Sequence, residues 1–493
     1  MTAMTSDALP AGTSGAETST AILVQHATAE WSYGDLLARL KSFQQQHVLQ
    51  FWDELSPDER HELAMQVEAI DLAQIQRLYE TRHDDHADAF DPAQVDGPPA
   101  YRLGVGNDPK RDELARSIGA AMLGAGTVGV VIVAGGQGSR LGFSNPKGMY
   151  PIGPISGATL FQMLFERVIA TSRKFGIRIP VYLMTSPATH EQTVQFLHAH
   201  ANFGLADEDL FIFCQGVMPA VDEQGRLLLS EKGQLFLSPN GHGGMLEALR
   251  RSRALEDMQR RGIEHLFYQQ IHNPLVDLID PKFIGYHVLS NSDVTTQVIP
   301  KQGPFDKAGN VVAIDGKVRI IEYSDLPDDL ACQRRGDGSL KLWAGNIAVH
   351  CFSVAFFEQV AEGAISLPFH YAHKKVPFLN DAGAVVEPES PNATKFEQFI
   401  FDLLPAARRA IVVEVDPVDV YGPVKNAPGS GQYSPEHVQE LMMGRYRRWL
   451  RAASVDVAEH TRVEISPLFA NSAQELRDKF SQRSALTRDA YLK

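Results

Sequence analysis

Hydrophobic and polar residues follow two patterns between residue 127 and about residue 415. Short runs of consecutive apolar residues at 130–133, 180–185, 210–213 and 266–271 are typical of buried strands. The segments between them predict helices at 160–174, 189–200 and 246–261, the first with Leu160, Leu164 and Val168 on one stripe. Strands that alternate with helices favour a mainly parallel sheet flanked by helices, so the pattern predicts an α/β fold.

Different patterns flank this region. Residues 31–115 predict a helical N-terminal module, in which Ser32 and Asp35 have the spacing of a capping box and Ser56-Pro57 marks a second helix start. Within it, the polar, proline-containing segment 84–102 predicts a linker. Residues 1–30, rich in Ser, Thr, Ala and Gly, predict a disordered tail. Residues 116–415 then form the central catalytic domain, and residues 416–493, with a basic helix at 435–452, form a small C-terminal domain.

Composition excludes several classes of function. The 493-residue chain has a formal net charge of −14, which argues against a nucleic-acid partner because such proteins present basic surfaces. No apolar run approaches the ~20 residues that span a bilayer, and residues 1–30 lack the parts of a secretory signal. Cys214, Cys332 and Cys351 lie far apart without a CxxC pair, which fits a reducing cytoplasm and predicts neither a disulfide framework nor a zinc site.

A glycine-rich loop follows the first predicted strand and carries the clearest chemistry. Residues 131–148 read VIVAGGQGSRLGFSNPKG, with Gly135 and Gly136 directly after the strand and Arg140 and Lys147 further along the loop. Unpaired N–H groups of such a loop suit phosphate oxygens, and the missing Cβ atoms allow close approach. Arg140 adds a bidentate guanidinium and Lys147 a mobile point charge. The loop therefore predicts a site for a triphosphate.

Two common phosphate-binding loops do not fit this sequence. In a P-loop, Ser or Thr follows the lysine, whereas Gly148 follows Lys147 here. In the dinucleotide fingerprint G-x-G-x-x-G, the third glycine would precede Gly142 by one position. The order GGQGSRLG…PKGMYPIG instead resembles the signature of sugar-nucleotide pyrophosphorylases.

Further segments in the same order resemble the eukaryotic-type UTP:sugar-1-phosphate uridylyltransferases, and most closely their N-acetylhexosamine branch. They read FCQGVMPA at 213–220, SPNGHGGMLEAL at 238–249, IIEYSDL at 320–326, LWAGNIAVH at 342–350 and GPVKNA at 422–427. The resemblance extends from about residue 35 to Leu468. It implies a Rossmann-like nucleotidyltransferase sheet with UTP and a sugar 1-phosphate, above all N-acetylglucosamine 1-phosphate, as substrates. It also implies Mg²⁺ as cofactor, with Mn²⁺ as the alternative.

The resemblance implies a role for each matching residue. The nucleotide would be contacted by Gly135, Gly136, Gln215, Gly241 and His242, and the catalytic cations on the phosphates would be Arg140, Lys147 and Lys425. The sugar phosphate would be bound by Gly243, Glu322, Asn346 and Lys395, with Glu322 accepting sugar hydroxyls and Asn346 at the C2 substituent. A carboxamide such as that of Gln215 suits uracil, which presents a donor and acceptors on one edge. Taken in isolation, Gln215 would be interpreted as a polar group at a strand end, Glu322 and Lys425 as surface charges, and Asn346 is compatible with a turn residue. Only the resemblance favours the roles above.

Two positions depart from the family pattern. His242 stands where the N-acetylhexosamine enzymes typically carry Asn and the UDP-glucose enzymes carry His, so glucose 1-phosphate or a broad range of sugar phosphates are alternative substrates. His272-Asn273 stands where the family has Asp-Asn, with the Asp on the metal. Mg²⁺ prefers oxygen ligands, and imidazole is a poor substitute. Phosphates and water then hold the ion, or Mn²⁺ replaces it, or the metal site is impaired.

Two other classes of function stay open. An impaired metal site would make the chain a catalytically silent sugar-nucleotide sensor. A nucleotide-binding scaffold whose N-terminal helices dock a partner is a further alternative, supported only by the acidic overall charge. The sequence leaves the oligomeric state open.

Overall fold

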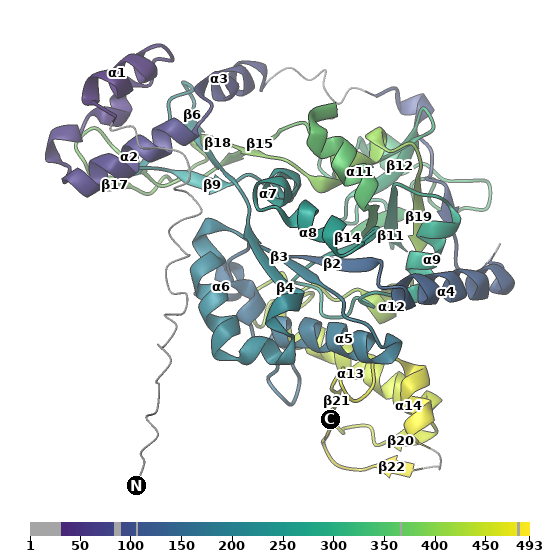
Figure 1. Cartoon of the computed structure of the whole chain (residues 1–493). Helices are drawn as coiled ribbons and strands as arrows, with labels where there is room; N and C mark the ends of the chain where they lie inside the picture. The colour runs from purple at the N-terminus through teal and green to yellow at the C-terminus, as the bar shows by residue number, and fades with distance from the viewer. Residues whose placement is uncertain (1–30, 83–89, 105–106, 365–366, 481–483) are drawn as a thin grey trace, which may run out of the picture.

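A mixed ten-stranded sheet organises the chain (Figure 1). The computed structural model describes residues 31–82, 90–104, 107–364, 367–480 and 484–493. Eight strands lie in a row, in the order β1 (Ala100–Tyr101), β19 (Ala410–Glu414), β11 (Val294–Pro300), β14 (Ala344–Ser353), β10 (His265–Gln270), β2 (Val128–Val133), β3 (Val181–Thr185) and β4 (Leu210–Cys214). Only β14 runs antiparallel to its neighbours in this row, and β12 (Asn310–Ile314) and β13 (Lys317–Ile321) extend the sheet beside it.

The structure confirms the predicted α/β fold with a mainly parallel sheet. The four strands predicted from apolar runs are β2, β3, β4 and β10, and they pair in parallel as β10-β2-β3-β4. Every residue of β3 is buried, as is nearly all of β2, which explains why these strands appear as uninterrupted apolar runs. The carboxyl ends of these strands therefore lie at one edge of the sheet.

The predicted helices at 160–174 and 189–200 are confirmed as α5 (Leu160–Phe175) and α6 (Pro187–Ala199). The prediction of a single helix at 246–261 is wrong. The chain forms α7 (Met245–Arg251) and α8 (Ala254–Arg260) instead, with a break at Arg253, whose φ is 61°. An unbroken helix would have carried the apolar stripe of α7 onto Arg253 and Glu256. The break brings Leu255 and Met258 of α8 back to the buried side instead.

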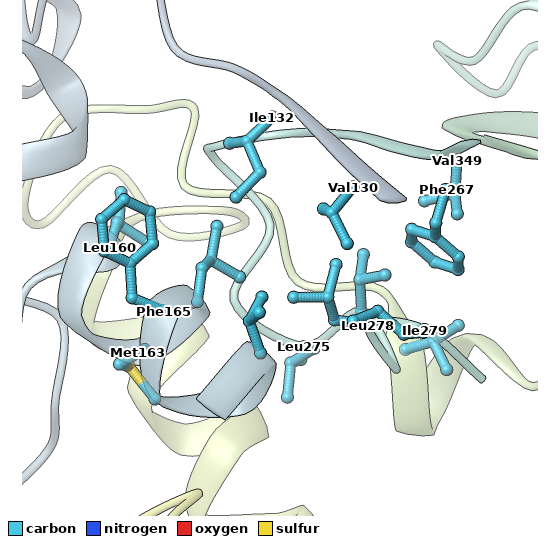
Figure 2. Close-up of a cluster of buried hydrophobic side chains, with 14 of the residues drawn as sticks. Val130, Ile132, Leu160, Met163, Phe165, Phe267, Leu275, Leu278, Ile279 and Val349 are labelled. Carbon is cyan, nitrogen blue, oxygen red and sulfur yellow. The ribbon is translucent and has the colours of Figure 1, made fainter. Parts of the chain in front are cut away.

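Helices cover both faces of the sheet. On one face, α5 and α9 (Pro281–Leu289) pack with α4 (Pro109–Gly124) and α13 (Pro435–Ala452). Figure 2 shows part of this core, where Ile132 and Val130 of β2 lie between the side chains of α5 and Phe267 of β10, which lies beside Val349. The other face is covered by α7, α8 and α11 (Val354–Gln359). The sheet is therefore buried on both sides, and its strand ends are where ligands have access.

The N-terminal helices pack away from this sheet. They are α1 (Tyr33–Lys41), α2 (Pro57–Ala69) and α3 (Leu72–Thr81), and both predicted helix starts are confirmed as capping boxes, at Ser32 and Ser56. Their apolar faces share a core with a three-stranded sheet formed by β15 (His370–Lys374), β18 (Ala393–Glu397) and β6 (Val221–Asp222). Figure 1 shows this module at the end of the molecule opposite to α4.

The C-terminal residues pack on the central sheet. The predicted basic helix is α13, and its buried Val438, Met442 and Leu450 belong to the same core as α5. After it come β20 (Val455–Val457), β21 (Val463–Ile465), α14 (Ala473–Lys479), β22 (Ser484–Leu486) and β23 (Ala490–Leu492). The division of the chain at residues 115/116 and 415/416 stays a prediction, and the first of these positions falls inside α4.

The predicted linker at 84–102 is only partly described, because residues 83–89 lie outside the described residues, as does the predicted tail at 1–30. Its last residues are not a linker: β1 pairs with β19 at the edge of the sheet, and Arg102 Nε lies 2.6 Å from Glu414 Oε2. A two-residue strand is too short to give a periodic signal. In the part of the chain that the structure describes, no helix has the length and apolar character that a bilayer crossing needs.

The crossing of α4 and α9 depends on two glycines and gives a test of the packing. A Cβ on Gly119 would lie 1.8 Å from Pro281 O, and one on Gly285 would lie 1.7 Å from Ala115 O. We expect Gly119→Ala to lower the free energy of unfolding by about 2–3 kcal/mol or more, because backbone atoms cannot rotate away. Thermal unfolding measures this as a lower Tm. Gly124→Ala in the same helix is the matched control, since its Cβ meets no atom within 4 Å; equal losses in both variants would contradict the packing argument.

Candidate active site

The glycine-rich loop after β2 is folded back on itself at the edge of the sheet. Gly138 N–H donates to Asn145 O (3.0 Å), and Lys147 N–H donates to Gly136 O (3.0 Å). Among the described residues, none accepts a hydrogen bond from the backbone N–H groups of Gly135, Gly136 or Gln137. A Cβ on Gly136 would meet no protein atom within 4 Å. The loop therefore presents free N–H donors beside open space, as a phosphate site requires.

Polar groups from the ends of β3 and β4 border this loop. Ser186 Oγ donates to Gly135 O (2.7 Å), and Gln215 N–H extends the pairing of the two strands by donating to Thr185 O (2.9 Å). A Cβ on Gly135 would lie 3.2 Å from Gln215 Oε1, so the buried carboxamide faces the loop. Within the described ranges, the Gln215 carboxamide has no hydrogen-bond partner. A free donor and acceptor at this position could read the edge of a base such as uracil.

Three predicted cations converge beside the loop. Burial, together with the charges of Arg140 and Lys425, lowers the pKa of Lys147 to about 8. Lys425 reaches the same place from the chain after α12 (Pro417–Val420), and burial and the charge of Arg140 lower its pKa, whereas Glu322 raises it. Val424 N–H donates to His272 O (2.8 Å), which ties this segment to the end of β10. Arg140, Lys147 and Lys425 thus act on one another as a cluster of positive charge.

Glu322 and Asn346 lie together on the other side of Lys425. A Cβ on Gly309 would lie 3.2 Å from Glu322 Oε1 and 3.8 Å from Asn346 Cβ. Asn346 N–H donates to Gly309 O (2.8 Å), and its Oδ1 accepts from Ala348 N–H (2.9 Å). Burial and the charge of Asp325 raise the pKa of Glu322, whereas His370 and Lys425 lower it. The arrangement offers a carboxylate acceptor beside an ammonium, which suits a sugar phosphate.

The second glycine-rich turn, residues 241–244, packs against the chain after β18. A Cβ on Gly241 would lie 2.3 Å from Gln398 O, and a Cβ on Gly243 would lie 2.7 Å from Gln398 C. Gly243 N–H also donates to Gln398 O (2.8 Å). The absence of side chains at these two predicted ligand positions is therefore required by packing within the protein, whether or not a ligand contacts them.

His242 is a neutral, oriented imidazole. Its Nδ1 accepts from Ile400 N–H (3.1 Å), its ring stacks on Phe399 with centroids 5.2 Å apart, and burial lowers its pKa to about 4. The ring proton therefore sits on Nε2. Phe399 stacks in turn on His370 (4.4 Å), whose Nε2 donates to Asp402 Oδ2 (2.8 Å). This stack of three rings joins the second glycine turn to the groups that surround Glu322.

Two predicted residues are not part of the cluster. The Lys395 ammonium lies over the ring of Phe236, 4.8 Å from its centroid, and its charged neighbours are Glu397 and Lys374. Asn273 is buried: its Nδ2 donates to Val420 O (2.9 Å), and its Oδ1 accepts from the N–H groups of Leu275 (3.2 Å) and Gly422 (3.1 Å). Asn273 has no lone pair left for a metal ion, and its role is to hold the turn after β10.

The residues at the predicted metal position do not fit a protein-held magnesium ion. His272 lies within the electrostatic reach of Lys425 and Lys147, and burial with these two charges holds its pKa well below the usual range. Across the described ranges, no group of three or more His, Cys, Asp or Glu side chains could hold an ion. An imidazole between two ammonium groups is a poor environment for a hard divalent cation.

Several residues of the site were not predicted from the sequence. Ser186 follows a predicted strand directly, so its place at the carboxyl end of β3 was a usable signal. His370 begins β15, Phe399 follows β18, and Asp402 lies in the 3-10 helix Ile400–Ala406. The pairing of β15 with β18 brings these residues to His242 and Glu322. No pattern in the sequence could have found them.

Comparison with known proteins identifies relatives over most of the chain. Residues 109–468 match the family described as UTP–glucose-1-phosphate uridylyltransferase. UDP-N-acetylglucosamine diphosphorylase 2 of Arabidopsis thaliana is 34% identical over 463 residues, 90% of each chain. UDP-N-acetylhexosamine pyrophosphorylase-like protein 1 of Homo sapiens is 35% identical over 435 residues, 85% of this chain and 86% of that protein.

A solved structure matches the fold along nearly the whole chain. The uridine diphosphate N-acetylglucosamine pyrophosphorylase from Trypanosoma brucei in complex with inhibitor superposes with a TM-score of 0.79 at 24% identity, covering 95% of this chain and 99% of that one. At 24% identity this structural likeness shows the fold alone. The family is shown by the sequence matches of the preceding paragraph.

Gly136 separates ligand binding from folding and gives a test of the loop. We expect Gly136→Ala to leave the Tm unchanged, because the added Cβ meets no protein atom. It should weaken UTP binding by about tenfold or more, because a Cβ holds the phosphates off the N–H donors. Isothermal titration calorimetry measures the affinity. Gly336→Ala, also in open space but outside the cluster, is the control; wild-type UTP affinity in Gly136→Ala would refute the phosphate loop.

Proposed function

The chain belongs to the UTP–glucose-1-phosphate uridylyltransferase family, and from this we propose that it joins UTP to N-acetylglucosamine 1-phosphate to give UDP-N-acetylglucosamine and pyrophosphate. Relatives that cover 90% of the chain carry the name of this N-acetylglucosamine activity. The observation that carries the proposal is the meeting of free N–H donors at Gly135 and Gly136 with Lys147, Lys425 and Glu322 at one edge of the sheet.

The reaction is an in-line displacement at the α-phosphorus of UTP. A phosphate oxygen of the sugar 1-phosphate attacks, a new P–O bond forms, and the bond to pyrophosphate breaks. The attacking oxygen is already anionic at neutral pH, because the second pKa of a phosphate monoester is about 6. A general base is therefore unnecessary. Catalysis depends on bringing two polyanions together and on neutralising the charge that develops in the transition state.

Each cation has a place in this scheme. The N–H groups of Gly135 and Gly136, with Arg140 and Lys147, stabilise the triphosphate and the leaving pyrophosphate. Lys425 lies between this cluster and Glu322, which supports a role on the incoming sugar phosphate. The carboxamide of Gln215 binds the uracil. Lys395 is left with a role at the periphery, since its ammonium lies over Phe236.

The sugar preference depends on the side of the site near Glu322. Asn346 keeps its Nδ2 free of partners in the described part of the chain while its Oδ1 is held by Ala348 N–H. A fixed donor suits the carbonyl oxygen of an N-acetyl group, whereas the Glu322 carboxylate accepts from hydroxyls. These groups support N-acetylglucosamine 1-phosphate over glucose 1-phosphate.

The cofactor proposal is correspondingly limited. Mg²⁺, or Mn²⁺ in its place, enters with the phosphates of UTP, because His272 and Asn273 do not offer it ligands. We also expect the protein to act in the cytoplasm, in keeping with its widely separated cysteines.

Pyrophosphate release tests the function directly. We expect turnover with UTP and N-acetylglucosamine 1-phosphate, and kcat/KM at least about tenfold lower with glucose 1-phosphate, the size of one lost hydrogen bond. GTP and dTTP in place of UTP test the base. Equal rates with both sugars would favour a broad UDP-sugar pyrophosphorylase. Binding of UDP-N-acetylglucosamine without turnover of any sugar phosphate would instead support the alternative of a catalytically silent sugar-nucleotide sensor.

The pKa of Lys147 predicts a pH dependence. Lys147 is protonated below pH 8 and neutral above it, so its attraction for the triphosphate is lost as the pH rises. We expect kcat/KM for UTP to fall about thirtyfold from pH 7 to pH 9.5 if only the protonated form is active. Lys147→Arg should shift this fall to higher pH, because a guanidinium stays protonated.

Truncation of the same side chain completes the test. Lys147→Ala should lose about 100-fold in kcat, the usual cost of one transition-state donor, and retain no fall near pH 8. Lys110→Ala, an exposed lysine of α4, is the control and should keep the wild-type profile. Near-normal turnover in Lys147→Ala would contradict the assignment.

A further inference from the structure

Position 272 carries a neutral imidazole in this chain, whereas the family pattern has a negatively charged Asp there. The net charge of the phosphate site therefore differs from the family pattern. His272 follows β10 directly and is fixed by its backbone, since His272 O accepts from Val424 N–H (2.8 Å). The next residue along that segment is Lys425, whose charge acts on the His272 ring together with that of Lys147. Among the described residues, no side chain or backbone group forms a hydrogen bond with the ring nitrogens of His272. The imidazole is therefore available to a ligand, at a position where the charges of Lys147 and Lys425 also act.

Among the described residues, no carboxylate acts on Lys147, and Glu322 is the carboxylate that acts on Lys425. The anionic neighbour of Lys425 is Glu322, which lies towards Asn346, and the charges that act on Lys147 are those of Arg140 and Lys425. Asn273 is fully engaged with Val420, Leu275 and Gly422. A divalent cation at this position would face the like charges of Lys147 and Lys425 and would gain no oxygen ligand from His272 or Asn273.

We propose that this chain neutralises the nucleotide phosphates with its own cations, so that UTP and UDP-sugar bind without a divalent ion held by the protein. The neutral His272 ring then serves as a hydrogen-bond partner of the phosphate rather than as a metal ligand. Lys147 and Lys425 supply the charge that a metal ion would otherwise supply, and the loop N–H groups add directed donors. This inference rests on the proposed function and names the ionic state of its phosphate site.

A carboxylate at position 272 should reverse this state. In His272→Asp, the new anion would pair with Lys147 and Lys425 and repel phosphate in the absence of metal. It would also provide the oxygen ligand that a hard divalent cation prefers. The variant should therefore depend on the metal for binding, whereas the wild-type protein should not.

Calorimetric titration with UDP-N-acetylglucosamine, in EDTA and in excess Mg²⁺, tests the proposal without relying on turnover. We expect the wild-type Kd to change by less than about threefold between the two buffers, and that of His272→Asp to weaken by about tenfold or more in EDTA and to recover in Mg²⁺. His198→Asp places the same charge at an exposed position of α6 and should behave as wild type. Titration of the wild-type complex with Mn²⁺, followed by electron paramagnetic resonance, should show no site tighter than that of the free nucleotide sugar.

The outcomes separate this inference from the proposed function. A wild-type affinity that falls tenfold or more in EDTA would overturn the inference, as would tight Mn²⁺ binding to the wild-type complex. Failure of UTP and UDP-N-acetylglucosamine to bind in either buffer would overturn the proposed function itself. If His272→Asp does not fold, the two wild-type measurements still decide the question.

Discussion

The parallel pairing of β10, β2, β3 and β4 is the constraint on which the site depends. Parallel strands bring their carboxyl ends to one edge, and here those ends carry His272, Gly135, Ser186 and Gln215. The strands are separated by long stretches of sequence, and only their hydrogen-bonded register brings these residues within reach of one another. Burial of both sheet faces by α5 and α9 on one side and α7 and α8 on the other makes this register rigid. The loops that follow these strands therefore complete the site close to the strand ends.

The same edge of the sheet concentrates positive charge, and the desolvation and repulsion of these cations are unfavourable until an anionic ligand binds. Burial and mutual repulsion lower the pKa values of Lys147 and Lys425, so the unliganded protein holds two partly desolvated ammonium groups close together. The net charge of −14 over the whole chain makes this positive cluster more distinctive. Polyanions that bind here relieve the repulsion and raise the lysine pKa values. Binding and charge neutralisation are therefore one event, which suits a reaction between two phosphates.

The sequence was informative where one physical rule acted alone. Runs of consecutive apolar residues predicted the strands β2, β3, β4 and β10, and the capping boxes at Ser32 and Ser56 predicted the starts of two helices. It was misleading where tertiary packing overrode local pattern, as at Arg253, where one predicted helix is two, and at β1, where a linker joins the sheet. Within the site, the glycine-rich motif indicated Arg140 and Lys147, and the separate segment GPVKNA indicated Lys425. The structure brings the charges of these residues within reach of one another, and their roles in the reaction stay predictions. The stack of His242, Phe399 and His370 was out of reach because it joins segments more than a hundred residues apart.

The dipeptide His272-Asn273 shows why a motif can keep its structure and change its chemistry. Asn273 bonds to Val420, Leu275 and Gly422, so its side chain holds together the two segments that carry His272 and Lys425. These hydrogen bonds require Asn at position 273 for the fold, independently of the reaction. The His272 ring forms no hydrogen bond with the described residues, so no hydrogen bond within the fold requires an imidazole there. Position 272 is therefore free to exchange a metal-binding carboxylate for a neutral imidazole while the turn, the loop and the two lysines stay in place.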